Sequence, residues 1–104
     1  LSNLPERVHD VRFNKDSGWI IMLHGKKIAL LNDLDSKPAI YRVPGPVLDV
    51  SPYEGGWKWT GWRHDGYLSN GRLSTFGRNE VGISLIDNIV LTNSGTWRIF
   101  KGDD

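Results

Sequence analysis

The chain of 104 residues contains no cysteine. This absence excludes a disulfide framework, a thiolate nucleophile and a cysteine-based zinc site, so the fold must be held together by packing alone. No apolar run approaches the roughly 18 residues that a membrane-spanning helix needs. The longest runs, such as WIIML at 19–23, fit a buried strand. We therefore expect a soluble protein and favour the cytoplasm, although a lack of cysteine does not prove a reducing compartment.

An excess of charge of one sign is also missing, because 13 Lys and Arg face 12 Asp and Glu, for a formal net charge of +1. No whole-molecule field therefore draws the chain to nucleic acid or to an anionic membrane, and electrostatic recognition must be local. Twelve Gly and five Pro interrupt the sequence so often that no long helical period survives, which argues against a helical bundle. The start, LSNLPERV, lacks a Met, a basic segment and an apolar signal region, as expected if an upstream portion were removed.

Short apolar segments rich in β-branched and aromatic residues follow one another along the whole chain, at the spacing typical of sandwiches and barrels. We expect strands at 7–13, 19–24, 27–32, 39–43, 47–51, 57–63, 67–69, 72–76, 81–86, 89–92 and 96–100. The prediction is an all-β single domain over residues 1–104. Its form would be a compact antiparallel sandwich or partly open barrel of about eight to ten short strands joined by tight hairpins.

Turn signals between these segments support the hairpins. Asn70-Gly71 is the pair that a type I′ turn favours, and Asp87-Asn88 separates two apolar segments in the same way. Asn93-Ser94-Gly95 fits a type I turn followed by a left-handed glycine. Three consecutive hairpins in the C-terminal third would form a meander. Pro44-Gly45-Pro46 interrupts the middle of the chain, because proline cannot donate to a central sheet.

Residues 8–33, VHDVRFNKDSGWIIMLHGKKIALLND, have the strand and turn cadence of a β-propeller blade. The signature His and Trp-Asp pairs are missing, and no second copy follows at a matching period. A chain of this length would hold only about two blades. The sequence therefore assigns no family, and an oligomeric ring stays open as an alternative.

The aromatic stretch WKWTGWRHDGY, residues 57–67, supports two interpretations. Side chains alternate along a strand, so Trp57 and Trp59 share one face and Lys58 takes the other. The structural interpretation, which we favour, places both indoles in the core and Lys58 in solvent. In the functional interpretation the aromatic rings form a stacking platform at the surface.

A local excess of positive charge keeps the functional interpretation open, because residues 56–79 contain four Lys and Arg but only Asp65 as an acid. Aromatic rings beside Arg are typical of protein–protein hot spots, and the same residue types stack bases and meet phosphates. We predict a non-catalytic interaction module that binds another protein, or a second copy of itself. The alternative is a nucleic-acid-binding β domain. The candidate contact residues are Trp62, Arg63, Tyr67, Arg72 and Arg78.

Motifs for catalysis are scarce. His9-Asp10 and His64-Asp65 are the pairs that suggest acid–base or metal chemistry, but adjacent strand residues face opposite ways. No nucleophile elbow and no phosphate-cradling glycine pattern is present. We expect no cofactor, no metal and no catalytic residue. An enzyme is the least favoured class, and its form would be a small hydrolase or nuclease around His64 and Asp65.

Overall fold

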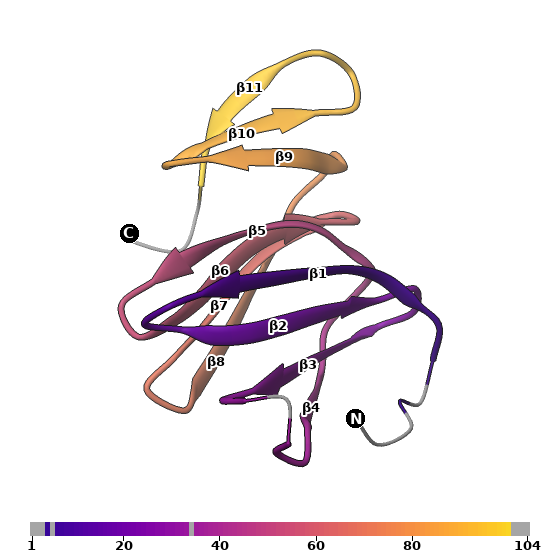
Figure 1. Cartoon of the computed structure of the whole chain (residues 1–104). Helices are drawn as coiled ribbons and strands as arrows, with labels where there is room; N and C mark the ends of the chain where they lie inside the picture. Colours follow the sequence, from indigo (N-terminus) through magenta and orange to yellow (C-terminus); the bar gives the residue numbers. More distant parts are fainter. Residues whose placement is uncertain (1–3, 5, 34, 101–104) are drawn as a thin grey trace.

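The computed structural model describes residues 4, 6–33 and 35–100, which form eleven strands in three successive antiparallel sheets (Figure 1). The first sheet contains β1 (Val8–Asn14), β2 (Gly18–Leu23), β3 (Lys27–Leu31) and β4 (Ala39–Arg42). The second contains β5 (Val47–Tyr53), β6 (Gly56–Gly61), β7 (His64–Ser69) and β8 (Arg72–Gly77). The third contains β9 (Gly82–Ile86), β10 (Ile89–Thr92) and β11 (Trp97–Ile99).

The all-β, antiparallel class is confirmed, with one strand more than the upper end of the expected range. The described residues form no helix, and so none that could cross a membrane. Each strand pairs with its neighbour in the chain, so every sheet is a simple meander. The first two sheets share the same four-stranded topology, which means that the chain repeats in topology although its sequence shows no repeat. As expected, the segment around Pro44-Gly45-Pro46 joins these two sheets.

The hairpin turns follow the signals in the sequence. Asn70 and Gly71 both have positive φ, 53° and 75°, as a type I′ turn requires. Gly95 has a φ of 85°, and its N–H donates to the carbonyl of Thr92 at 3.0 Å. The meander prediction was wrong in one respect: the Asn70 hairpin belongs to the second sheet, so only the last two hairpins build the third sheet.

One tight turn was missed. The strand predicted over 57–63 ends at Gly61, and Trp62 and Arg63 form the turn into β7. Arg63 takes a φ of 59°, a conformation that non-glycine residues rarely adopt. Because neither residue is a turn former, the sequence held no signal for it.

The main core lies between the first two sheets. Trp57 and Trp59 are 2% and 0% exposed, so the structural interpretation of these two rings is confirmed. Gly66 stands opposite Trp59 on β7, where a Cβ atom would come within 2.6 Å of the indole. The indole of Trp59 therefore depends on this glycine for space. The remaining core residues are Ile20, Met22, Ile28, Val43, Val47, Val50 and Leu68.

Lys58 was expected in solvent and is buried instead, with 8% of its surface exposed. The reason is that the third sheet packs on the second face of β6. The Lys58 ammonium donates to the side-chain oxygen of Asn88 at 2.9 Å and lies 5.3 Å from the ring centre of Phe100. The burial is therefore compensated by a hydrogen bond and a cation–π contact.

Two further contacts hold the third sheet against the second. Gly82 lies so close to Thr60 that a Cβ atom would meet its hydroxyl oxygen at 1.9 Å. The Asp49 carboxylate accepts the backbone N–H of Leu85 at 2.7 Å and the guanidinium of Arg12 at 3.2 Å. Since Arg12 is on β1 and Leu85 on β9, one carboxylate on β5 links all three sheets.

Replacing Trp59 with Phe is expected to destabilise the fold more than replacing Trp57 with Phe. The indole N–H of Trp59 donates to His64 Nε2 at 3.2 Å, so its loss leaves a buried acceptor unpaired. The buried Trp57 N–H has no hydrogen-bond partner within the part of the chain that the structure describes. We expect the free energy of unfolding in urea to fall by about 1–2 kcal/mol more for Trp59→Phe. Equal losses would contradict the assigned bond.

Candidate interaction surfaces

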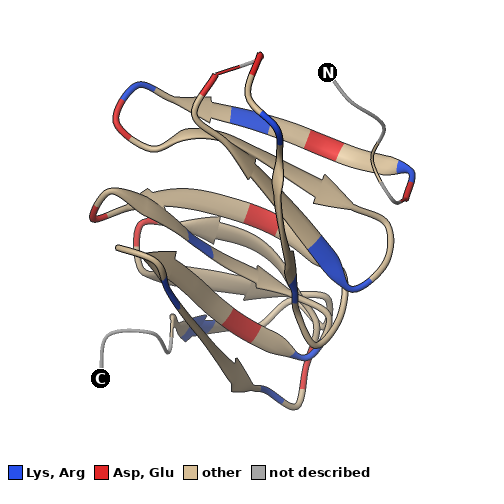
Figure 2. Cartoon of the chain, turned by 90° about the horizontal axis from the view of Figure 1, so that it is seen from below, with Lys and Arg blue, Asp and Glu red and all other residues tan. Residues whose placement is uncertain are grey.

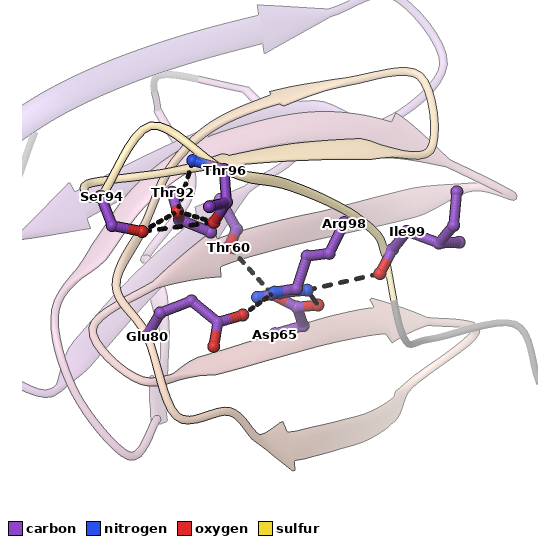
Figure 3. Close-up of polar contacts among 8 residues, drawn as sticks. All are labelled: Thr60, Asp65, Glu80, Thr92, Ser94, Thr96, Arg98 and Ile99. Atoms are coloured by element: carbon purple, nitrogen blue, oxygen red, sulfur yellow. Dashed lines mark hydrogen bonds and ion pairs between the residues drawn. The ribbon is translucent and has the colours of Figure 1, made fainter.

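A buried ionic cluster joins β11 to β7 (Figure 3). Asp65 is fully buried, and both of its carboxylate oxygens pair with the guanidinium of Arg98, one of them at 2.7 Å. Thr60 donates to the same carboxylate at 2.8 Å, and Glu80 accepts from Arg98 Nε at 2.6 Å. The acid of the predicted His-Asp pair is therefore engaged in a structural ion pair.

The arginine stays charged in this environment. Burial works against the cation, but the hydrogen bonds and negative charges of Asp65 and Glu80 outweigh it and raise the pKa of Arg98 above its ordinary value. A guanidinium held by two carboxylates has fixed geometry, so the cluster positions β11 over the second sheet.

His64 lies on the opposite face of β7, in the main core. Its Nε2 accepts the Trp59 N–H, so the proton sits on Nδ1, which lies 3.2 Å from the carbonyl oxygen of Trp62. Burial lowers the pKa of His64, although the carbonyl of Trp62 and the charge of Asp65 oppose this effect. His64 and Asp65 therefore do not converge on a common point. No group of three His, Asp or Glu that could hold a metal occurs among the described residues.

The five predicted contact residues fall into two groups. Trp62, Arg63 and Arg78 lie at the end of the second sheet where β6 turns into β7. The backbone N–H of Arg78 donates to the carbonyl of Arg63 at 2.9 Å. Trp62 is 54% exposed, and its backbone and Cβ approach Gly45 in the connection between the first two sheets.

Tyr67 and Arg72 lie toward the other end of β7 and line a shallow hollow of about 310 Å³. The ring of Tyr67 packs between the rings of Tyr53 and Phe76, with distances between ring centres of 5.3 Å and 6.1 Å. The rise along a strand separates this group from the first by on the order of 15 Å. The remaining residues around the hollow are Tyr53, Glu54, Ser69 and Asn70.

A further apolar surface lies on the side of the third sheet that faces away from the second. Strand register places Ile86, Ile89 and Ile99 in one row across β9, β10 and β11. Leu91 and Trp97 form the next row together with Ser84. Exposure reaches 73% for Trp97, 68% for Ile86 and 60% for Ile99. We call this surface, formed by Ser84, Ile86, Ile89, Leu91, Trp97 and Ile99, the outer face of the third sheet.

A hollow of about 290 Å³ opens on this face, beside the exposed indole of Trp97. Asp87 is the only charged residue among the described residues that line it. The other charged residues in the described part of the chain, of both signs, are scattered over strands and turns (Figure 2). The outer face of the third sheet is therefore a nearly uncharged, apolar surface of the kind that marks an interaction site.

Sequence reasoning did not single out this face, although a signal for it exists. The segments ISLI and IVL are apolar in both phases of the strand alternation, a pattern expected of strands that are covered on both sides. Within the described structure the second sheet covers only one side of these strands, where Leu85 and Val90 are buried together with Phe100. The apolar residues on the other side of the strands face outward.

Comparison with models of protein families, with curated proteins and with solved structures finds no match to this chain. Function must therefore be inferred from the geometry and chemistry of its own surfaces.

Removing the guanidinium of the buried pair should strongly destabilise the protein. Arg98→Met removes the Arg98 charge from the buried Asp65 carboxylate, and we expect the free energy of unfolding in urea to fall by about 3–5 kcal/mol. Adding Asp65→Asn to that variant should restore part of the loss, because the buried negative charge is then gone. Arg72→Met, at an exposed position, is the matched control and should change stability by less than about 0.5 kcal/mol. A loss no larger than that of the control would contradict the role of the pair.

Stability should also depend on pH through His64. Its pKa in the folded protein lies below the ordinary value of 6.5, so the unfolded chain binds a proton first as the pH falls. Stability is therefore fully retained above about pH 6.5 and declines below it, by up to about 1.4 kcal/mol per pH unit. His64→Gln keeps an acceptor for Trp59 but cannot titrate. Thermal unfolding from about pH 7.5 to 5.5 should show a flatter profile for this variant; parallel profiles would exclude His64 as the cause.

Proposed function

We propose that this chain is a non-catalytic protein-recognition module whose main contact surface is the outer face of the third sheet. The observation that carries this proposal is the combination of high exposure and apolar character at Trp97, Ile86 and Ile99. Exposed patches of several hundred Å² are uncommon on monomers and often mark interaction sites. Tryptophan is also the residue most enriched among binding hot spots.

The rigidity of the support favours the same function. The outer face lies on three hydrogen-bonded strands, and β11 is anchored to the second sheet by the Asp65–Arg98 pair. A contact surface on a fixed scaffold loses little conformational entropy on binding. The hydroxyls of Thr92, Ser94 and Thr96 bond one another at 2.7–3.2 Å and stiffen the turn that precedes Trp97.

The aromatic and basic residues expected at the contact are compatible with a secondary role. Trp62, Arg63 and Arg78 are on a different part of the second sheet from Tyr67 and Arg72, so a single small ligand does not reach all five. A nucleic-acid strand is the alternative that would use such separated cations. This alternative makes a different prediction about salt.

The immobilised chain should retain a protein partner from an extract of the cells that express the chain. This retention should be lost for Trp97→Ala and should persist for Trp62→Ala. Both residues are exposed indoles, but only Trp97 is on the outer face of the third sheet. Because the contact is apolar, retention should also change little with added salt. Binding of nucleic acid that weakens steeply with salt, with a slope lowered by the pair Arg63→Ala and Arg72→Ala, would instead support the alternative.

A further inference from the structure

The outer face of the third sheet carries both halves of a self-complementary contact. Trp97 projects as a bulky exposed side chain, and the hollow of about 290 Å³ lies directly beside it. A hollow of this size suits one large aromatic side chain. In a two-fold interface each surface meets an identical one, so that a projection on one copy can fill the hollow on the other. The adjacency of Trp97 and the hollow meets this geometric requirement.

The chemistry of the face also selects an apolar partner. Among the described residues that line the hollow, Asp87 supplies the only charge and Ser84 the only other polar side chain. A charged or hydrogen-bonding partner would leave its polar groups without matching ones in the contact. A second copy of the same face presents Ile86, Leu91 and Ile99, whose burial is favourable on both sides. Face-to-face packing of sheets is already the mode by which this chain builds its own core.

The opposite end of the molecule exposes its apolar residues only along its edge strands. At the centre of the outer side of the first sheet, Ile21, Leu23, Ala29 and Leu31 are at most 4% exposed, and Leu4 and Trp19 pack against this cluster. Register places Val11, Phe13 and Ile40, which are 40–58% exposed, on the same side of β1 and β4. Contact of the outer face of the third sheet with itself closes at two copies, whereas contact with these edge strands of another copy would be head-to-tail.

The exposed area is sufficient for a weak dimer. The apolar side chains of the face expose on the order of 500 Å² in one copy. Two copies would bury about 1,000 Å², near the lower limit of specific interfaces, so a dissociation constant of roughly 1–100 µM is expected. We infer that the partner of this surface is a second copy of the chain, in a two-fold dimer with Trp97 of each copy in the hollow of the other. This inference rests on the proposed function, since it names the partner of the same surface.

Sedimentation equilibrium over a range of concentrations tests the association. The unaltered chain should form dimers with a dissociation constant in that range, and Trp97→Ala should weaken dimerisation by at least about tenfold, as expected for loss of a hot-spot residue. Trp62→Ala is the matched control, because it removes an exposed indole that lies off the face. Far-ultraviolet circular dichroism confirms that each variant is folded. A dimer that is equally strong in both variants would overturn the inference.

The symmetry can be tested because the chain has no cysteine of its own. Leu91→Cys introduces a single thiol on the outer face of the third sheet, and Phe13→Cys a single thiol on exposed β1. A short bifunctional maleimide should couple two copies of Leu91→Cys covalently and should leave Phe13→Cys uncoupled, although the latter still associates through the outer face of the third sheet. Coupling that requires a mixture of the two variants would indicate a head-to-tail contact and would overturn the two-fold arrangement.

The two proposals fail in different ways. If the unaltered chain stays monomeric at all concentrations, and Trp97→Ala abolishes binding of a different protein, the dimer is overturned and the recognition function stands. A chain for which Trp97→Ala changes neither self-association nor the retention of any protein would overturn both.

Discussion

The burial of β6 on both of its faces is the constraint on which the rest of the structure depends. All six residues of Gly56–Gly61 are buried, although the side chains alternate between two chemically different surroundings. Trp57 and Trp59 enter the core against the first sheet, whereas Lys58 and Thr60 point toward the third. A strand that is apolar on one side and polar on the other needs two different covers. The first and third sheets supply them.

The polar side of the second sheet explains why the third sheet is fixed so firmly. The two sheets are joined by specific hydrogen bonds and an ion pair: Asp49 to Leu85, Lys58 to Asn88, and Asp65 to Arg98. Each of these groups would be costly to bury alone, so the sheets can pack closely only in the register that pairs them. The apolar cluster of Leu85, Val90 and Phe100 is small by comparison. Directional contacts therefore determine the orientation of the third sheet, and with it the direction in which its outer face points.

The two ends of the molecule differ in where their apolar residues are exposed. On the outer side of the first sheet the central strands are buried, and the edge strands expose Val11, Phe13 and Ile40. The third sheet instead exposes Trp97 and isoleucines across its strands. We propose recognition of a partner at the third sheet. The two residues that first suggested chemistry, His64 and Asp65, serve the interior on opposite faces of β7. The hydrogen bonds of His64 and the ion pair of Asp65 hold the scaffold, whereas the proposed contact uses apolar area.

Much of the strand pattern was predictable because its signals are local. Turn residues such as Asn70 and Gly71 have preferred backbone angles whatever surrounds them, and the alternation in residues 57–59 placed both indoles on one face. The Trp62-Arg63 turn was not predictable, because Arg63 adopts a positive φ and neither turn residue is of a type that favours this conformation. The repeated four-stranded topology was also hidden, since pairing in a meander needs suitable turns and alternation but no repeated residues.

The sequence by itself determined the all-β class, the positions of most strands and turns, and which side chains share a face. Only the tertiary structure decided what covers each face. Alternation assigns residues to two sides of a strand but carries no information about which side meets another sheet. For this reason Lys58 is buried although its pattern predicted solvent, and Trp97 is exposed together with its apolar cross-strand partner Leu91.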